Sequence, residues 1–381
     1  MLKDIKVLDL SHVFPGHFAG QTLGDLGAEV IKIEDPNRPD LLRSFSPCIG
    51  SESAFFLAVN RNKKSLLLDI KSPEGKAVFL RLVKTVDIVL ENFRPGHMDN
   101  LGLGYDTLSQ INPALIYCNI SGFGVHPGIN GARGAHDLNF ISESGILAAT
   151  TDQDGSPVMP GISIGALSGG LYATIAILSA LHNRSTTGKG TCITTSIFDG
   201  LLQMASIAAS KIDPTSKEQM PINNYIYKTK DHKYVALAAI EEKFWRAFLT
   251  AIQRLDLLPA HGTKATVENP VFMELKALFI EKTQEEWLVN LLDVDCCFSP
   301  VWDYTHALTS PYIKAKNLPI NIEHPTAGVL HQLPLPFVFS NQKYKKQNAP
   351  PLSGEHTRTV LHALGLSEDE LALLFEKGVI K

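Results

Sequence analysis

The sequence predicts an α/β fold with two domains, a large one built on an open parallel sheet and a smaller α+β one. Three observations predict it. Residues 5–34 have a strand–helix–strand pattern, and short apolar runs alternate with helical patterns as far as residue 209. A polar stretch with two prolines at 211–221 then precedes a hairpin pattern and several helices. The first pattern is typical of parallel βαβ units with right-handed crossovers, whereas the hairpin indicates antiparallel pairing.

The large domain begins with IKVLDLS at 5–11, an apolar run that ends in small polar residues as a buried strand does. Small and apolar residues at helical spacing fill 14–27, and AEVIKIE at 28–34 predicts the second strand. Further elements are predicted as strands at 65–70, 86–93 and 114–124, a helix at 73–85, a small-residue-rich buried helix at 163–183, and a strand followed by a helix at 191–209. In a Rossmann-like sheet of this kind, ligands bind beyond the C-terminal strand ends.

The small domain is expected at 222–315, after a linker at 211–221 that closes the N-terminal part of the large domain, 1–210. Alternating residues at 223–240 predict an antiparallel hairpin with its turn near Asp231-His232. Helical patterns follow at 241–255, 271–282 and 283–294. The tail from about residue 325 is again β-like and loop sequence, and it ends in an amphipathic helix at 367–378.

Composition excludes several classes of protein. With 381 residues, 44% hydrophobic and 19% charged, the chain is globular rather than disordered. A net charge of -4 gives no general attraction to nucleic acid. The five cysteines form no CxxC and no even disulfide framework, and are expected to be thiols in a reducing cytosol. We find no signal-peptide pattern, and the longest apolar run is too short for a membrane span. A soluble cytoplasmic protein without nucleic-acid or membrane partners is therefore expected.

Seven segments together carry a resemblance to a known family. They are VLDLS, LGDLGAEVIKIEDP, VNRNKKSLLLDIKSPEG, ENFRPGHMDNLGLGY, NPALIYCNISGFG, RSTTGKG and APPLSGEHTRTVL. In this order and spacing, the chain resembles the class III CoA-transferases (CaiB/BaiF-type) and is closest in motif to their α-methylacyl-CoA racemase relatives. The resemblance implies that 316–381 return to the large domain, that two ring-like chains interlock as a homodimer, and that CoA lies along the large domain. Acyl-CoA is then the substrate, and we expect no tightly bound cofactor and no metal.

Basic residues are the candidate ligands of the CoA phosphates, since a planar guanidinium suits phosphate and lysine supplies a point charge. Arg61, Lys63 and Lys64 form one cluster before a strand, Arg94 follows another strand, and Arg38 lies in the loop after the second strand. A solvated surface patch is the alternative for any such run. The resemblance adds Asn92, in the ENFRPG block, and His17, which it places near the thioester end.

His136 is the candidate acid/base, because the racemases have a histidine in a motif that AHDLNF at 135–140 resembles. Transferases generally lack this histidine, so His136 favours the racemase branch. The segment AAIEEKFW resembles the racemases' small-domain motif and gives Glu241 a supporting role. The alternative for Glu241 is a carboxylate favoured by the dipole at a helix start.

The catalytic aspartate of both branches is missing. Alignment on the racemases puts Gly165 at its position, and alignment on the transferases puts Ala166 there. Neither side chain can act as a nucleophile or base, and an unassisted Ser163 or Ser168 is a poor nucleophile. If 136–146 are helical, Glu143 lies at i+7 from His136, about 10 Å along the same face. Glu143 is therefore a candidate replacement, or else simply an exposed carboxylate.

The sequence favours an enzyme that transfers a proton at the α-carbon of an acyl-CoA, with His136 central and Glu241 or Glu143 assisting. A CoA-transferase is the alternative enzyme, but the missing aspartate weakens this interpretation more, because CoA transfer needs that residue as a covalent nucleophile. A CoA-ester-binding paralogue without catalysis is the third reading. A nucleotide-dependent dehydrogenase is disfavoured, because no GxGxxG follows the first strand.

Overall fold

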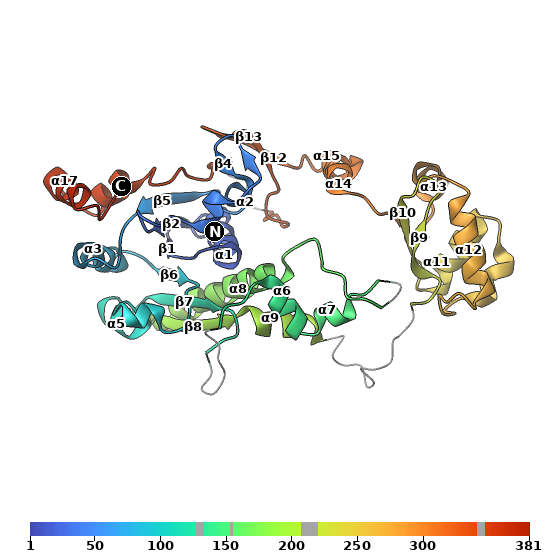
Figure 1. Cartoon of the computed structure of the whole chain (residues 1–381), viewed down its shortest axis with the longest axis horizontal. Coiled ribbons are helices and arrows are strands. Elements are labelled where there is room, and N and C mark those ends of the chain that lie inside the picture. The colour runs from blue at the N-terminus through green and yellow to red at the C-terminus, as the bar shows by residue number, and fades with distance from the viewer. Residues whose placement is uncertain (126–132, 153–154, 207–219, 341–346) are drawn as a thin grey trace. The chain divides into compact units, whose positions relative to one another are not determined.

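The computed structural model describes residues 1–125, 133–152, 155–206, 220–340 and 347–381 (Figure 1). The chain forms two compact units: residues 1–210 with 319–381, here called the large unit, and residues 211–318, here called the small unit. Most of the predicted linker at 211–221 lies outside the described residues.

A parallel six-stranded sheet is the centre of the large unit in the part of the chain that the structure describes. Its strand order is β5-β2-β1-β6-β7-β8. The strands are β1 (Lys6–Asp9), β2 (Glu29–Glu34), β5 (Lys63–Leu67), β6 (Ile88–Glu91), β7 (Ile116–Ser121) and β8 (Thr191–Ser196). Every neighbouring pair is parallel. The predicted α/β class is therefore confirmed, because buried apolar runs separated by helices can pair in parallel only through crossovers.

Helices cover both faces of this sheet (Figure 1). One core contains Leu8 and Leu66 from the strands with residues from α3 (Pro73–Val83), α5 (Tyr105–Ile111), α16 (Thr357–Ala363) and α17 (Glu368–Glu376). The other contains Val7 and Ile88 with residues from α1 (Phe14–Asp25), α6 (Asp137–Glu143), α8 (Ile164–Thr187) and α9 (Ile197–Met204). Strand residues point alternately to the two faces, so both cores draw on the same strands.

α8 is the longest helix of the described chain, and it ends at Gly188 with a left-handed backbone (φ 69°). By length and composition alone it is apolar enough to cross a membrane. Its small residues instead pack against α1 and α9 as part of the core. Among the described residues, Leu167, Leu171 and Ile175 form an exposed strip at successive turns of this helix.

The small unit has the predicted hairpin, formed by β9 (Asn224–Lys228) and β10 (Tyr234–Ala238). A third strand, β11 (Phe298–Pro300), pairs with β10, and three residues were too few to predict it. The helices are α11 (Glu242–Ala251), η2 (Leu255–Ala260), α12 (Pro270–Ile280), α13 (Gln284–Leu291), α14 (Tyr304–Thr309) and α15 (Pro311–Ala315). Stacked rings of Tyr227, Phe279 and Phe248 fill its core.

The remaining short elements belong to the large unit: η1 (Leu41–Ser44), β3 (Cys48–Ile49), β4 (Glu52–Ser53), α2 (Ala54–Ala58), α4 (His97–Asn100), α7 (Ile146–Ala149), β12 (Ile320–His324) and β13 (Gly328–Gln332). β12 and β13 form a hairpin. Beyond α17, Ile380 bridges Leu68 next to β5, so the last residues close that edge of the sheet.

Candidate functional site

The strand order reverses between β1 and β6, because the chain runs outward from β1 through β2 to β5 and from β6 through β7 to β8, and a ligand crevice is expected at this point. Ligands of open α/β sheets bind where the strand order reverses, outside the C-terminal strand ends. Asn92 joins the two loops at this point. Its Oδ1 accepts the backbone N–H of His12 at 2.7 Å, and its Nδ2 donates to the His12 carbonyl at 2.6 Å. The Asn92 side chain therefore holds the rim of the crevice together.

Aromatic rings and an exposed cation line this rim. The ring of Phe93 lies 5.4 Å from that of His12 and 4.7 Å from that of His97. Arg94 is exposed, and the ion pairs of the described arginines do not include it. Its Nη2 lies 3.5 Å from the point that a Cβ on Gly134 would occupy, so the guanidinium lies against the segment leading to His136. Arg94 is thus available to a phosphate.

Arg38 keeps its predicted position in the loop after β2. It is exposed, and its backbone bridges Asp35. Asp35 pairs with Lys71 at 2.8 Å. No ion pair among the described residues uses the Arg38 side chain, which therefore also remains available to an anion.

The predicted phosphate cluster of Arg61, Lys63 and Lys64 requires correction. Lys63 is buried, and its Nζ donates to Asp9 Oδ2 at 2.8 Å. Arg61 is 4% exposed, and it donates to the Asp25 carboxylate through Nε at 2.9 Å and through Nη2. Lys64 points to the other face of β5 and pairs with Glu29 at the surface. Arg61 and Lys63 use their donors inside the chain, so the three residues form no common phosphate site.

Lys63 belongs to a buried charge network beneath the crevice, and His17 belongs to the same network. His17 is 0% exposed, with Nε2 2.7 Å from Asp40 Oδ2 and Nδ1 3.2 Å from Ser11 Oγ. Lys32 Nζ donates to the same Asp40 oxygen at 2.8 Å. The imidazole is therefore enclosed by the protein, and the place of His17 near the thioester end stays a prediction.

The charges of this network fix its protonation. Burial and then the charge of Lys32 lower the pKa of His17 to about 4, so His17 is neutral at neutral pH. Burial raises the pKa of Asp9, but the ammonium groups of Lys63 and Lys32 outweigh it and lower that pKa to about 2. The network is thus a set of paired charges that shapes the loop after β1.

Gly165 and Ala166 are the second and third residues of α8, and both are buried. Ser163 precedes the helix and makes no side-chain cap. The acceptor for the first turn of α8 comes instead from α6. The Ala166 N–H donates a hydrogen bond to Asp137 Oδ1 at 2.9 Å. Ser168 packs against Gly200, with its hydroxyl buried and unpartnered among the described groups. The start of α8 therefore carries a carboxylate from another element.

His136 precedes α6 and is exposed, and its backbone N–H donates to Asn139 Oδ1 at 3.0 Å. Glu143 is the last residue of α6 and pairs with Arg133, whose guanidinium also covers the ring of Phe123. Residues 136–146 do not form one helix, because the chain is interrupted at Gly145, which has a φ of 82°. Among the described contacts Glu143 reaches Arg133 and not His136, so it is occupied as an ion-pair partner.

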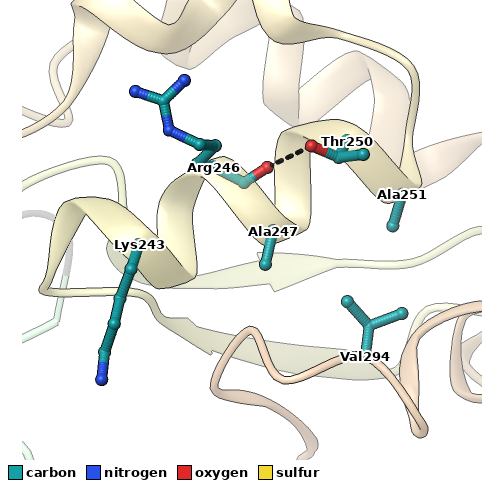
Figure 2. A pocket seen from close by; sticks show the side chains of 6 residues that line it. All are labelled: Lys243, Arg246, Ala247, Thr250, Ala251 and Val294. Carbon is teal, nitrogen blue, oxygen red and sulfur yellow. Dashed lines mark hydrogen bonds between the residues drawn. The ribbon is translucent and has the colours of Figure 1, made fainter.

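The small unit holds Glu241, which directly precedes α11, is exposed and makes no cap bond to that helix. A hollow of about 500 Å³ lies over α11 (Figure 2). Its lining residues are Lys243, Arg246, Ala247, Thr250, Ala251 and Val294. None of the predicted catalytic residues lines it, so it does not define the site.

Comparison with known proteins decides the family. The model of CoA-transferase family III matches residues 2–357. The chain belongs to CoA-transferase family III. Human succinyl-CoA:glutarate CoA-transferase is 32% identical, over all of this chain and 90% of the relative. Mouse α-methylacyl-CoA racemase is 30% identical, over all of this chain and 98% of the relative. A CaiB/BaiF family protein from Brucella suis has the same fold, with a TM-score of 0.82, 28% identity and coverage of 94% of this chain and 98% of that one.

As a member of CoA-transferase family III, the chain is an acyl-CoA enzyme of a family that includes both transferases and racemases. Sequence reasoning missed the contact between the Asp137 carboxylate and the first turn of α8. The available signal was the place of Asp137 beside His136 in AHDLNF, but the contact with α8 spans 29 residues and depends on tertiary packing.

Proposed function

We propose that this family III member transfers a proton at the α-carbon of an acyl-CoA thioester, as a racemase or epimerase does. CoA would lie at the C-terminal ends of β1 and β6, with its phosphates near Arg94 and Arg38. A thioester carbonyl makes the α-proton removable, provided that the developing enolate is stabilised. Covalent CoA transfer instead requires a carboxylate nucleophile, and Gly165 and Ala166 offer none from their own side chains.

The observation that carries the proposal is the exposed imidazole of His136 at the start of α6, directly beside the residue that meets the first turn of α8. Histidine is the side chain most often used for general acid–base catalysis. Neither Glu143, which pairs with Arg133, nor the buried His17 is free for this task.

Deuterium exchange tests the proposal. In D2O, the wild type should introduce deuterium at the α-carbon of a 2-methylacyl-CoA, and His136→Ala should lower the exchange rate by at least about 100-fold. His182→Ala, an exposed histidine on α8, is the matched control and should keep the wild-type rate. Exchange that persists in His136→Ala contradicts the role of the imidazole. CoA binding without exchange or acyl transfer in the wild type would instead favour a non-catalytic paralogue.

CoA transfer is the second candidate, and similarity supports it. Acetyl-CoA:oxalate CoA-transferase from Acetobacter aceti is 34% identical over 82% of this chain and 83% of the relative. Incubation of an acyl-CoA with a second carboxylic acid distinguishes the two reactions. A new CoA ester identifies transfer, whereas deuterium at the α-carbon without a new ester identifies proton transfer.

Arg94→Ala is expected to weaken CoA binding by about 10- to 100-fold, since charge-assisted hydrogen bonds contribute about 1.5–3 kcal/mol. Isothermal titration at fixed ionic strength measures the effect, with Arg358→Ala, which removes a surface pair with Glu368, as the control. Equal losses with CoA and dephospho-CoA would assign Arg94 to the pyrophosphate, and a loss with CoA alone to the 3′-phosphate. Unchanged affinity for both ligands would contradict the assignment.

A homodimer is also part of the proposal. The exposed strip of Leu167, Leu171 and Ile175 follows one face of α8, and Leu202 and Met204 are exposed on the neighbouring α9. Exposed apolar residues on two neighbouring helices are a candidate interaction site. A second copy of the chain would cover it, as the family resemblance implies. Sedimentation equilibrium tests this directly, since the dimer has twice the 41.7 kDa mass of the chain.

A further inference from the structure

The carboxylate of Asp137 occupies the space that a side chain at position 165 would need. A Cβ built on Gly165 would lie 2.8 Å from Asp137 Oδ1, 3.0 Å from Ile197 Cγ2 and 3.3 Å from Leu201 Cδ1. Any larger residue at 165 must therefore displace the Asp137 carboxylate. The position of the Asp137 carboxylate therefore depends on the absence of a side chain at residue 165.

The first turn of α8 holds this carboxylate in place. Asp137 Oδ1 accepts the Ala166 N–H at 2.9 Å, and the Gly165 N–H also contributes. α8 has 24 residues, and the positive end of its dipole favours a negative charge here. Burial nevertheless raises the pKa of Asp137, in opposition to these two hydrogen bonds. The half-buried carboxyl group therefore holds a proton more readily than a carboxylate in water.

Both alignments of the missing aspartate converge on this carboxylate. Position 165 is within contact of Asp137 Oδ1, and the N–H of Ala166 is its hydrogen-bond donor. α6 thus supplies the carboxylate that the family otherwise has on α8 itself. His136 is the adjacent residue, so the two proton-transfer groups come from one short segment.

We propose that Asp137 replaces the missing family aspartate as the second catalytic carboxylate, opposite His136 across the α-carbon; the inference rests on the proposed proton transfer. In one direction the Asp137 carboxylate accepts the α-proton, and the C–H electron pair moves into the thioester as an enolate. The His136 imidazolium then donates a proton to the other face of the same carbon. In the reverse direction the two roles exchange, so every proton removed is replaced.

A purely structural role predicts something different, because Asp137 also caps α8. Asp137→Asn keeps an amide oxygen at the position of Oδ1 as an acceptor for the Ala166 N–H while removing the carboxylate. If Asp137 only caps the helix, this variant should retain activity. If it transfers a proton, the variant should lose activity while it remains folded.

The experiment measures deuterium exchange into a 2-methylacyl-CoA, CoA affinity and melting temperature for the full chain. Asp137→Asn should lower kcat for exchange by at least about 100-fold, with CoA affinity and melting temperature near wild type. Asp106→Asn removes an exposed carboxylate on α5 and is the matched control. Exchange within about threefold of wild type in folded Asp137→Asn overturns the assignment of Asp137 alone. Absence of exchange in the wild type overturns the proposed function together with it.

Discussion

Lys63→Met is expected to lower the free energy of unfolding of the large unit by about 3–5 kcal/mol, because it leaves the Asp9 carboxylate buried without its ion-pair partner. Lys64→Met, one residue along the chain, should cost no more than about 1 kcal/mol. The side chain of Lys63 is 0% exposed in its pair with Asp9, whereas the Lys64 and Glu29 side chains are 40% and 35% exposed. Two identical substitutions on neighbouring residues thus separate a buried pair from a surface pair.

Urea unfolding followed by hydrogen exchange of the β1 and β5 amides measures this difference in the large unit. The three tryptophans, Trp245, Trp287 and Trp302, all lie in the small unit, so their fluorescence provides an internal control in the same samples. Their unfolding midpoint should be the same in both variants. Similar losses for Lys63→Met and Lys64→Met would contradict the burial of the Lys63–Asp9 pair.

Acidification is expected to destabilise the large unit in two steps. The pKa of His17 is about 4 in the folded chain because of burial and of Lys32, against about 6.5 when unfolded. The unfolded state therefore binds the proton first, and stability on the order of 3 kcal/mol is lost between pH 6.5 and 4. For Asp9 and Glu34, burial raises the pKa but buried cations outweigh it and lower it to about 2. Their contribution is present above pH 4 and is lost between about pH 4 and 2.

Urea midpoints of the large unit at pH 7, 5 and 3 test this order. His17→Gln removes the first titration, so its stability should change less than that of the wild type between pH 7 and 5. Below pH 4 the variant and the wild type should lose stability in parallel, because Asp9 and Glu34 remain. Equal slopes for the two proteins between pH 7 and 5 would show that His17 is not held neutral in the folded state.

The strands and helices of the large unit were predictable because their signals are local. An apolar run of buried-strand length and a helical spacing of small residues need no knowledge of partners. β11 was missed, because a three-residue strand has no periodicity of its own. The condition that placed Glu143 on one face with His136, a single helix over 136–146, is not met, because the left-handed backbone of Gly145 separates α6 from α7.

The candidate site was less predictable, because burial and tertiary contact decide it. Lys63 and Lys64 are adjacent in a basic run, but neighbouring residues on a strand point to opposite faces. That alternation was present in the sequence and argues against a single patch. The partners of Arg61 and Asp137 lie in other elements, and no local pattern identifies them. Arg94, which follows a strand and faces no described acidic partner, remains a predicted phosphate ligand.

The closure of the sheet edge by Ile380 has a consequence for the order of folding. Leu68 and Ile380 pair although the whole small unit lies between them in the sequence. α16 and α17 pack beside β5 in the same core. Such distant contacts close slowly, because much chain entropy is lost before they form. During synthesis the β5 edge stays open until residues beyond the small unit have been made, whereas the small unit draws its contacts from one continuous segment. The inserted unit can therefore fold first, while the nascent large unit still exposes an open strand that invites aggregation.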